Sequence, residues 1–154
     1  MRIFSSFLFL VILWTSLDAQ VINGYAQVTA IAGNVLTIGT TNETGATFTV
    51  GKDVVIMQMQ DNVIGTNTGN NALFGNLSAI QQAGRYAIRK IAAVTRSGGV
   101  LTSVTLNGAT GITFNTGANS SVQIIAHELL GGGGNYTTVA NISALPWTGA
   151  VGGM

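Results

Sequence analysis

The histidine at position 127 is the first candidate for chemistry, because it is the only histidine in the chain and Glu128 follows it directly. Adjacent side chains on a β-strand point to opposite faces, so we expect this His–Glu pair not to act together. A metal site built on one histidine would need several carboxylates, and only four follow residue 19. These four acidic residues are Glu43, Asp53, Asp61 and Glu128. We therefore predict no metal site and no Ser–His–Asp arrangement.

Asp53 and Asp61 are the next candidates, as a carboxylate pair for glycoside hydrolysis. They bracket one predicted strand, which separates them by ~26 Å at ~3.3 Å per residue. Paired glycosidase carboxyl groups lie within about 10 Å of each other. The spacing therefore argues against catalysis by this pair, and we predict no catalytic residues.

Two loops could hold an ion or a phosphate. The run GGGGNY at 131–136 has neither a following Lys-Ser/Thr nor a helix signal, so we expect a loop and no cofactor. Asp61, with Asn62, Asn67, Asn70 and Asn71, could offer oxygens to calcium. The spacing of a calcium loop is absent, which favours a turn-rich surface excursion.

Aromatic side chains could form a platform for a carbohydrate. They are spread along the chain, and most occupy positions that suit a core. Tyr136 and Trp147 are the two weak candidates for a ligand platform, and packing is the competing interpretation for both.

The elements that would position these residues are short apolar stretches rich in Val, Ile and Thr, broken by Gly and Asn. The chain has 21 glycines and one proline. This pattern predicts a small all-β domain, an antiparallel barrel or sandwich built from hairpins. The expected strands are 25–31, 35–38, 48–50, 54–60, 85–95, 100–106, 122–130 and 136–139.

Two glycine turns mark hairpins, at Ala32–Asn34 and Arg96–Gly99. In the strand VVIMQMQ, we expect Val55, Met57 and Met59 on one face and the alternate residues on the other, and this is the best candidate for a central strand. The Asn/Gly-rich connection at 61–84 contains a candidate short helix near 77–83.

The first 19 residues have the pattern of a signal peptide. Arg2 precedes the apolar run FLFLVILW at 7–14, and a small residue, Ala19, precedes the expected cleavage site before Gln20. The run is too short for a bilayer-spanning helix of about 20 residues. We therefore expect export to the cell surface or medium, with no membrane span in the mature chain.

Charge is scarce, at 7% of residues, and cysteine is absent. Beyond residue 19, five cations face four acids, so no field of one sign would attract nucleic acid. Disulfides cannot contribute to stability. Strands with so few charges could associate edge to edge.

Residues 141–154 end in a Pro-Trp pair followed by glycines. We interpret them as the start of a truncated glycine-rich β segment or linker, after a β domain at 20–140. This interpretation makes the chain a fragment whose partners include downstream modules of the same polypeptide.

Two sequence runs are the most specific evidence of a family resemblance, VGKDVVIMQMQ at 50–60 and the closing PWTG at 146–149. With INGYAQVTAIAGNVLTI and AGRYAIRKIAAV, they resemble the N-terminal module of large Bacteroidetes secreted or cell-surface proteins. The resemblance implies type IX secretion and adhesin-like or gliding-associated roles, and it transfers no catalytic residues. We expect a non-catalytic structural or interaction module whose partner is a surface glycan or protein. The alternative is a carbohydrate-binding accessory module of a secreted polymer-degrading enzyme.

Overall fold

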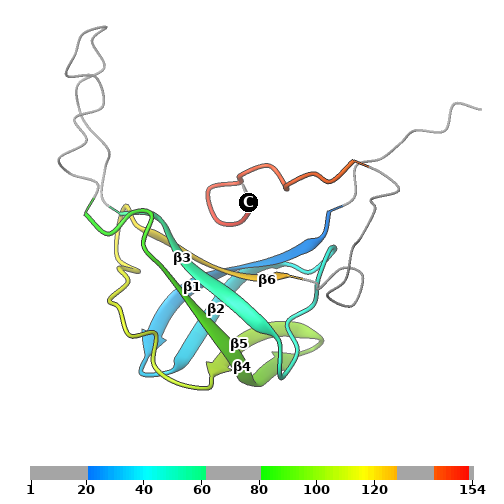
Figure 1. The fold of residues 1–154 in the computed structure, drawn as a ribbon, viewed down its shortest axis with the longest axis horizontal. Helices are drawn as coiled ribbons and strands as arrows, with labels where there is room; N and C mark the ends of the chain where they lie inside the picture. Colours follow the sequence, from blue (N-terminus) through cyan, green and yellow to red (C-terminus); the bar gives the residue numbers. More distant parts are fainter. Residues whose placement is uncertain (1–20, 62–80, 128–140, 153–154) are drawn as a thin grey trace, which may run out of the picture.

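The computed structural model describes residues 21–61, 81–127 and 141–152 (Figure 1). These residues form strands and loops, and none of them lies in a helix. The six strands are β1 (Asn23–Ala32), β2 (Val35–Asn42), β3 (Asp53–Gln60), β4 (Tyr86–Ser97), β5 (Val100–Leu106) and β6 (Ser121–His127). The all-β prediction is thus confirmed.

The strands form a closed barrel in the order β1-β2-β5-β4-β3-β6, and every neighbouring pair is antiparallel. Of the two architectures expected, the barrel is the one that forms. The ring closes where β1 pairs with β6, with Tyr25 opposite Ile125. Closure gives each of the six strands a hydrogen-bonded neighbour on both sides, so the barrel reduces the strand edge through which charge-poor strands would associate.

The two predicted hairpins are present. β1 pairs with β2 across a turn at Gly33, and β4 pairs with β5 across Gly98–Gly99. Gly98 and Gly99 both have positive φ, at 57° and 84°, the geometry of a two-residue turn that matches the strand twist. Glycine is needed there because a Cβ atom disfavours this backbone region.

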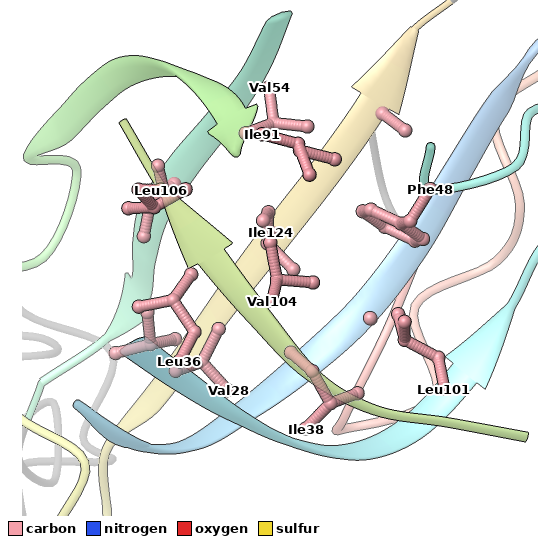
Figure 2. Packing of buried hydrophobic residues seen from close by; sticks show 14 of the residues in the cluster. Val28, Leu36, Ile38, Phe48, Val54, Ile91, Leu101, Val104, Leu106 and Ile124 are labelled. Carbon is pink, nitrogen blue, oxygen red and sulfur yellow. The ribbon is translucent and has the colours of Figure 1, made fainter. Parts of the chain in front are cut away.

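The barrel interior is filled by apolar side chains that alternate along the strands (Figure 2). On β3, Val54 and Ile56 point inward and are fully buried, while Val55 and Met57 face outward and are partly exposed, as the alternation predicted. The large apolar side chains that are fully buried in this core are Leu36, Phe48, Ile56, Ile91, Leu101, Leu106 and Ile124.

Two connections close the ends of the barrel. The connection between β2 and β3 inserts Ala46 and Phe48 into the core, so residues 48–50 are loop rather than the predicted strand. At the other end, the connection between β5 and β6 packs Phe114 against the same core. Phe48 fills the opening at one end of the barrel. Strand periodicity in the sequence does not reveal this role.

The remaining predicted elements have mixed outcomes. Residues 81–84, the end of the candidate helix near 77–83, form a turn in which Gln81 has a φ of 40°, which is incompatible with a right-handed helix. Residues 77–80 and the predicted strand at 136–139 lie outside the described residues. β3 is not a uniquely central strand, because every strand of a closed barrel has two neighbours.

Replacing Phe48 with alanine should destabilise the mature chain by about 3–5 kcal/mol, because the substitution leaves a cavity at the plugged end of the barrel. Urea unfolding of residues 20–154 measures this change. Val50→Ala is the matched control, since Val50 lies in the same loop but is 63% exposed. Its effect should stay within about 0.5 kcal/mol. Equal effects of the two substitutions would contradict the plugging role.

Candidate functional site

The outer face of the barrel is partly covered by the chain's own C-terminal segment. Residues 145–152, which we call the strap, cross outside the barrel on the side of β1 and β6, in red in Figure 1. Val151 forms a second buried apolar cluster with Tyr25 of β1 and Ile125 of β6, and Leu145 packs against the cluster. β6 is therefore buried on both faces along Ser121–Ala126.

A buried amide holds the strap in place. The side chain of Gln123, on the outer face of β6, accepts a hydrogen bond from the Gly152 N–H at 2.7 Å and donates one to the Gly152 carbonyl at 3.3 Å. Gly152 has a φ of 108°, and a Cβ there would lie 2.3 Å from the Pro146 carbonyl oxygen. Position 152 therefore requires glycine, and the glutamine amide satisfies both of its buried backbone groups.

The strap also carries an internal turn. The Thr148 hydroxyl accepts from the Val151 N–H, and the Thr148 N–H donates to the Val151 carbonyl at 3.1 Å. This turn leaves Trp147 41% exposed while Val151 points into the cluster. Of the two predicted platform residues, Trp147 is thus accessible, and Tyr136 lies outside the described residues.

A second feature is an open cavity of about 480 Å³ where β3 begins, beside β4 and the start of the β5–β6 connection. Asp53 and Lys90 face it and form an ion pair with a 3.1 Å Nζ–Oδ1 distance. Ile88, Arg89 and residues 107–109 complete the lining. The sequence indicated no site here, because these residues are spread over three segments that only the barrel brings together.

Arg89 fixes the loop that forms one wall of this cavity. Its Nε donates to the Ala109 carbonyl at 2.8 Å, and a terminal nitrogen donates to the Thr110 carbonyl at 2.6 Å. Asn107 reinforces the wall, since its N–H donates to the Lys90 carbonyl at 2.9 Å. The loop is thus held to β4 by the Arg89 guanidinium and by the backbone hydrogen bond from Asn107 to Lys90.

Glu43 and Arg96 form a bidentate pair that fixes the connection plugging the barrel. The two N···O distances are 2.7 and 2.6 Å, and Glu43 also accepts from the Phe48 N–H. The hydrogen bonds from Arg96 hold the pKa of Glu43 below its usual range despite partial burial. The same contact raises the pKa of Arg96.

Asp61 is fully buried just beyond the end of β3 and organises the opposite end of the barrel. It accepts from the Gln82 N–H, from Asn115 Nδ2 and from the Ser120 hydroxyl at 2.8–2.9 Å. Burial alone would raise the pKa of Asp61, but these hydrogen bonds outweigh it and hold the pKa below its usual range. Asp61 therefore acts as a buried anionic acceptor for three segments.

Gln58 supports the same end of the barrel from inside. Its amide donates to the carbonyls of Gln60 and Asn115 and accepts from the Asn115 N–H at 2.8 Å. Sequence reasoning did not identify Gln58 or Gln123 as important. The available signal was glutamine within an otherwise apolar strand, in VVIMQMQ and in VQIIAH.

The other candidate residues are placed apart. Asp53 and Asp61 lie at opposite ends of β3, as the spacing predicted. His127 is exposed at the end of β6. Within 21–61, 81–127 and 141–152, no three His, Asp or Glu side chains gather as a metal site would require. Outside the described residues lie Ala19, Gln20, Glu128, the 131–134 glycines and four asparagines of the calcium candidate, Asn62, Asn67, Asn70 and Asn71.

No helix within the described part of the chain is long and apolar enough to cross a membrane. Comparison with known protein families, curated proteins and solved structures finds no match to this chain.

Asp61 should make the fold sensitive to acid. Because its folded pKa lies below the model-compound value of 3.8, the carboxylate stabilises the fold at neutral pH. This stabilisation is lost as the pH falls through the folded pKa. Asp61→Asn should cost about 1–3 kcal/mol at pH 7, since an amide cannot accept all three hydrogen bonds. Thermal unfolding between about pH 5 and pH 2 should show a shallower acid dependence in the variant. An unchanged acid dependence would contradict this role.

Gln123→Ala should release the strap, because it leaves the Gly152 N–H and carbonyl without their partner. Hydrogen exchange measured by NMR should become faster at Val151 and Gly152 while the β1–β6 amides stay protected. Gln27→Ala is the matched control, since Gln27 lies opposite Gln123 on β1 and makes no hydrogen bond to the described strap residues. Equal exchange in the two variants would argue against the amide as the anchor.

Proposed function

We propose that the chain is a non-catalytic structural or interaction module of an exported bacterial surface protein, with a role in adhesion. The observation that carries the proposal is the use of the acidic residues. Glu43 and Asp61 hold loops at the two ends of the barrel, and Asp53 pairs with Lys90. The hydrogen-bonded carboxylates of Glu43 and Asp61 stabilise a rigid scaffold, and their lowered pKa values make them weak bases for proton transfer.

The strap supports the same proposal. An outer barrel face that buries an extended segment through Tyr25, Ile125 and Gln123 can anchor the chain that links this module to others. The proposed partners are downstream modules of the same polypeptide and a surface glycan or protein. The resemblance of VGKDVVIMQMQ and PWTG to Bacteroidetes surface proteins motivates the proposed type IX route.

A carbohydrate-binding accessory module of a secreted polymer-degrading enzyme is the second candidate. The observation in its favour is the 41% exposure of Trp147, since a buried indole could not serve as a platform for a sugar ring. In this alternative, Trp147 contacts the polymer and the barrel is its support.

Export is tested by expressing the full chain in a Gram-negative host and measuring the mass of the product outside the cytoplasm. The product should begin at Gln20. Leu10→Arg should keep the precursor inside the cell, because a charge interrupts the apolar run that the export machinery recognises. A full-length chain that stays in the cytoplasm would overturn this part of the proposal.

The surface role is tested in the source organism. Antibodies raised against residues 20–154 should label intact cells, and deletion of the gene should lower attachment of the cells to surfaces. Unlabelled intact cells, or unchanged attachment of the deletion strain, would count against an adhesive module.

A further inference from the structure

We infer that the cavity beside Asp53 and Lys90, together with the neighbouring side chains of Tyr86 and Ile88, binds a short stretch of an oligosaccharide. This inference rests on the proposed interaction role and names its partner as a glycan. It places the contact on β3 and β4, rather than on Trp147 of the strap.

The cavity has a preformed wall. Arg89 pins the carbonyls of Ala109 and Thr110, and the N–H of Asn107 donates to the Lys90 carbonyl. The cavity has a volume of about 480 Å³ and is shallow and widely open to solvent, unlike the enclosed pockets that bury most of a small-molecule ligand. A ligand would therefore meet a rigid surface and would not need to order the loop on binding.

The polar groups in the cavity suit hydroxyl groups. Among the described residues, Lys90 Nζ contacts Asp53 Oδ1 at 3.1 Å and the Gly51 carbonyl at 2.9 Å, which leaves one of its three donors for a ligand. The second Asp53 oxygen has no hydrogen bond from the described residues. A hydroxyl both donates and accepts, so neighbouring hydroxyls on a sugar can use the carboxylate and the ammonium together.

An apolar shelf lies next to these groups. Tyr86, Ile88 and Lys90 alternate along β4 and therefore share its outer face, at intervals of about 6.6 Å. Tyr86 is 61% exposed and Ile88 is 55% exposed, and Ile88 also lines the cavity. Because Tyr86 and Lys90 are about 13 Å apart along β4, the C–H face of one sugar ring can pack on Tyr86 while the hydroxyls of a sugar further along the same oligosaccharide reach Asp53 and Lys90.

The chemistry favours a glycan over other partners. The lining has one acid and two cations, and Arg89 is engaged with main-chain carbonyls, so a polyanion would find little free positive charge. Two exposed apolar side chains form a small shelf, whereas a stable protein interface buries about 800 Å² on each partner. Neutral oligosaccharides offer the required hydroxyls without adding negative charge, so a neutral glycan is the expected ligand, and an anionic oligosaccharide serves as the comparison.

The test is isothermal titration of residues 20–154 with laminarihexaose, xylohexaose and hexagalacturonate. We expect saturable binding of at least one neutral hexaose at one site per chain, which would assign the site to hydroxyls. Binding of hexagalacturonate alone would overturn the assignment to a neutral glycan. Tyr86→Ala and Asp53→Asn should each weaken binding about tenfold.

Two controls locate the site. Val100→Ala removes an equally exposed apolar side chain at the β4–β5 turn, and it should leave binding unchanged. Trp147→Ala should also leave binding unchanged if the cavity is the site. Thermal unfolding of every variant should match the parent chain, because the exposed Asp53–Lys90 pair contributes little stability.

Loss of binding in Trp147→Ala, with normal binding in Tyr86→Ala, would overturn this site and move the glycan to the strap. Failure of all three hexaoses to bind would overturn the inference itself. The proposed function would survive that result if intact cells are still labelled and the deletion strain attaches poorly, so the two failures can be told apart.

Discussion

The pairing of β1 with β6 is the interaction on which the rest of the structure depends. It joins the first strand to the last, from Asn23 opposite His127 to Val28 opposite Val122, and it turns an open sheet into a barrel. Closure encloses the apolar side chains without a disulfide. It also pairs the strand edges that a chain with few charges could not protect by repulsion. The outer face that receives the strap exists only because these two strands lie side by side (Figure 1).

The few charges and amides work at the boundaries of this barrel. Glu43 with Arg96 fixes the plug at one end, and Asp61 with Gln58 organises the other. Gln123 joins the strap to the outer face. Arg96 is exposed, whereas the other polar groups are buried or partly buried and have the hydrogen-bonding partners that a low-dielectric environment requires. A few hydrogen-bonded polar side chains thus position the loops at both ends of the barrel and the strap on its outer face.

The outer surface divides into a covered part and an open part, and this division links the fold to the proposals. The strap covers Tyr25 and Ile125, whereas Tyr86 and Ile88 on β4 remain exposed beside the cavity. The covered part is the basis of the proposed connection to other modules. The open part combines apolar side chains with a carboxylate and an ammonium, and this combination is the basis of the proposed glycan site.

The sequence by itself determined the all-β class, the two glycine hairpins and the inward–outward alternation of Val54 to Met57, because these depend on local turn chemistry and a period of two. It also separated Asp53 from Asp61 along one strand. Only the tertiary structure decided that the sheet closes and that residues 48–50 plug its end. It also showed that the Gln123 amide hydrogen-bonds both backbone groups of Gly152 at the end of the strap. These features arise from contacts between residues far apart in the chain, and local periodicity carries no information about them. The cavity escaped prediction for the same reason, since Asp53, Lys90 and Asn107 meet only when β3, β4 and β5 have assembled.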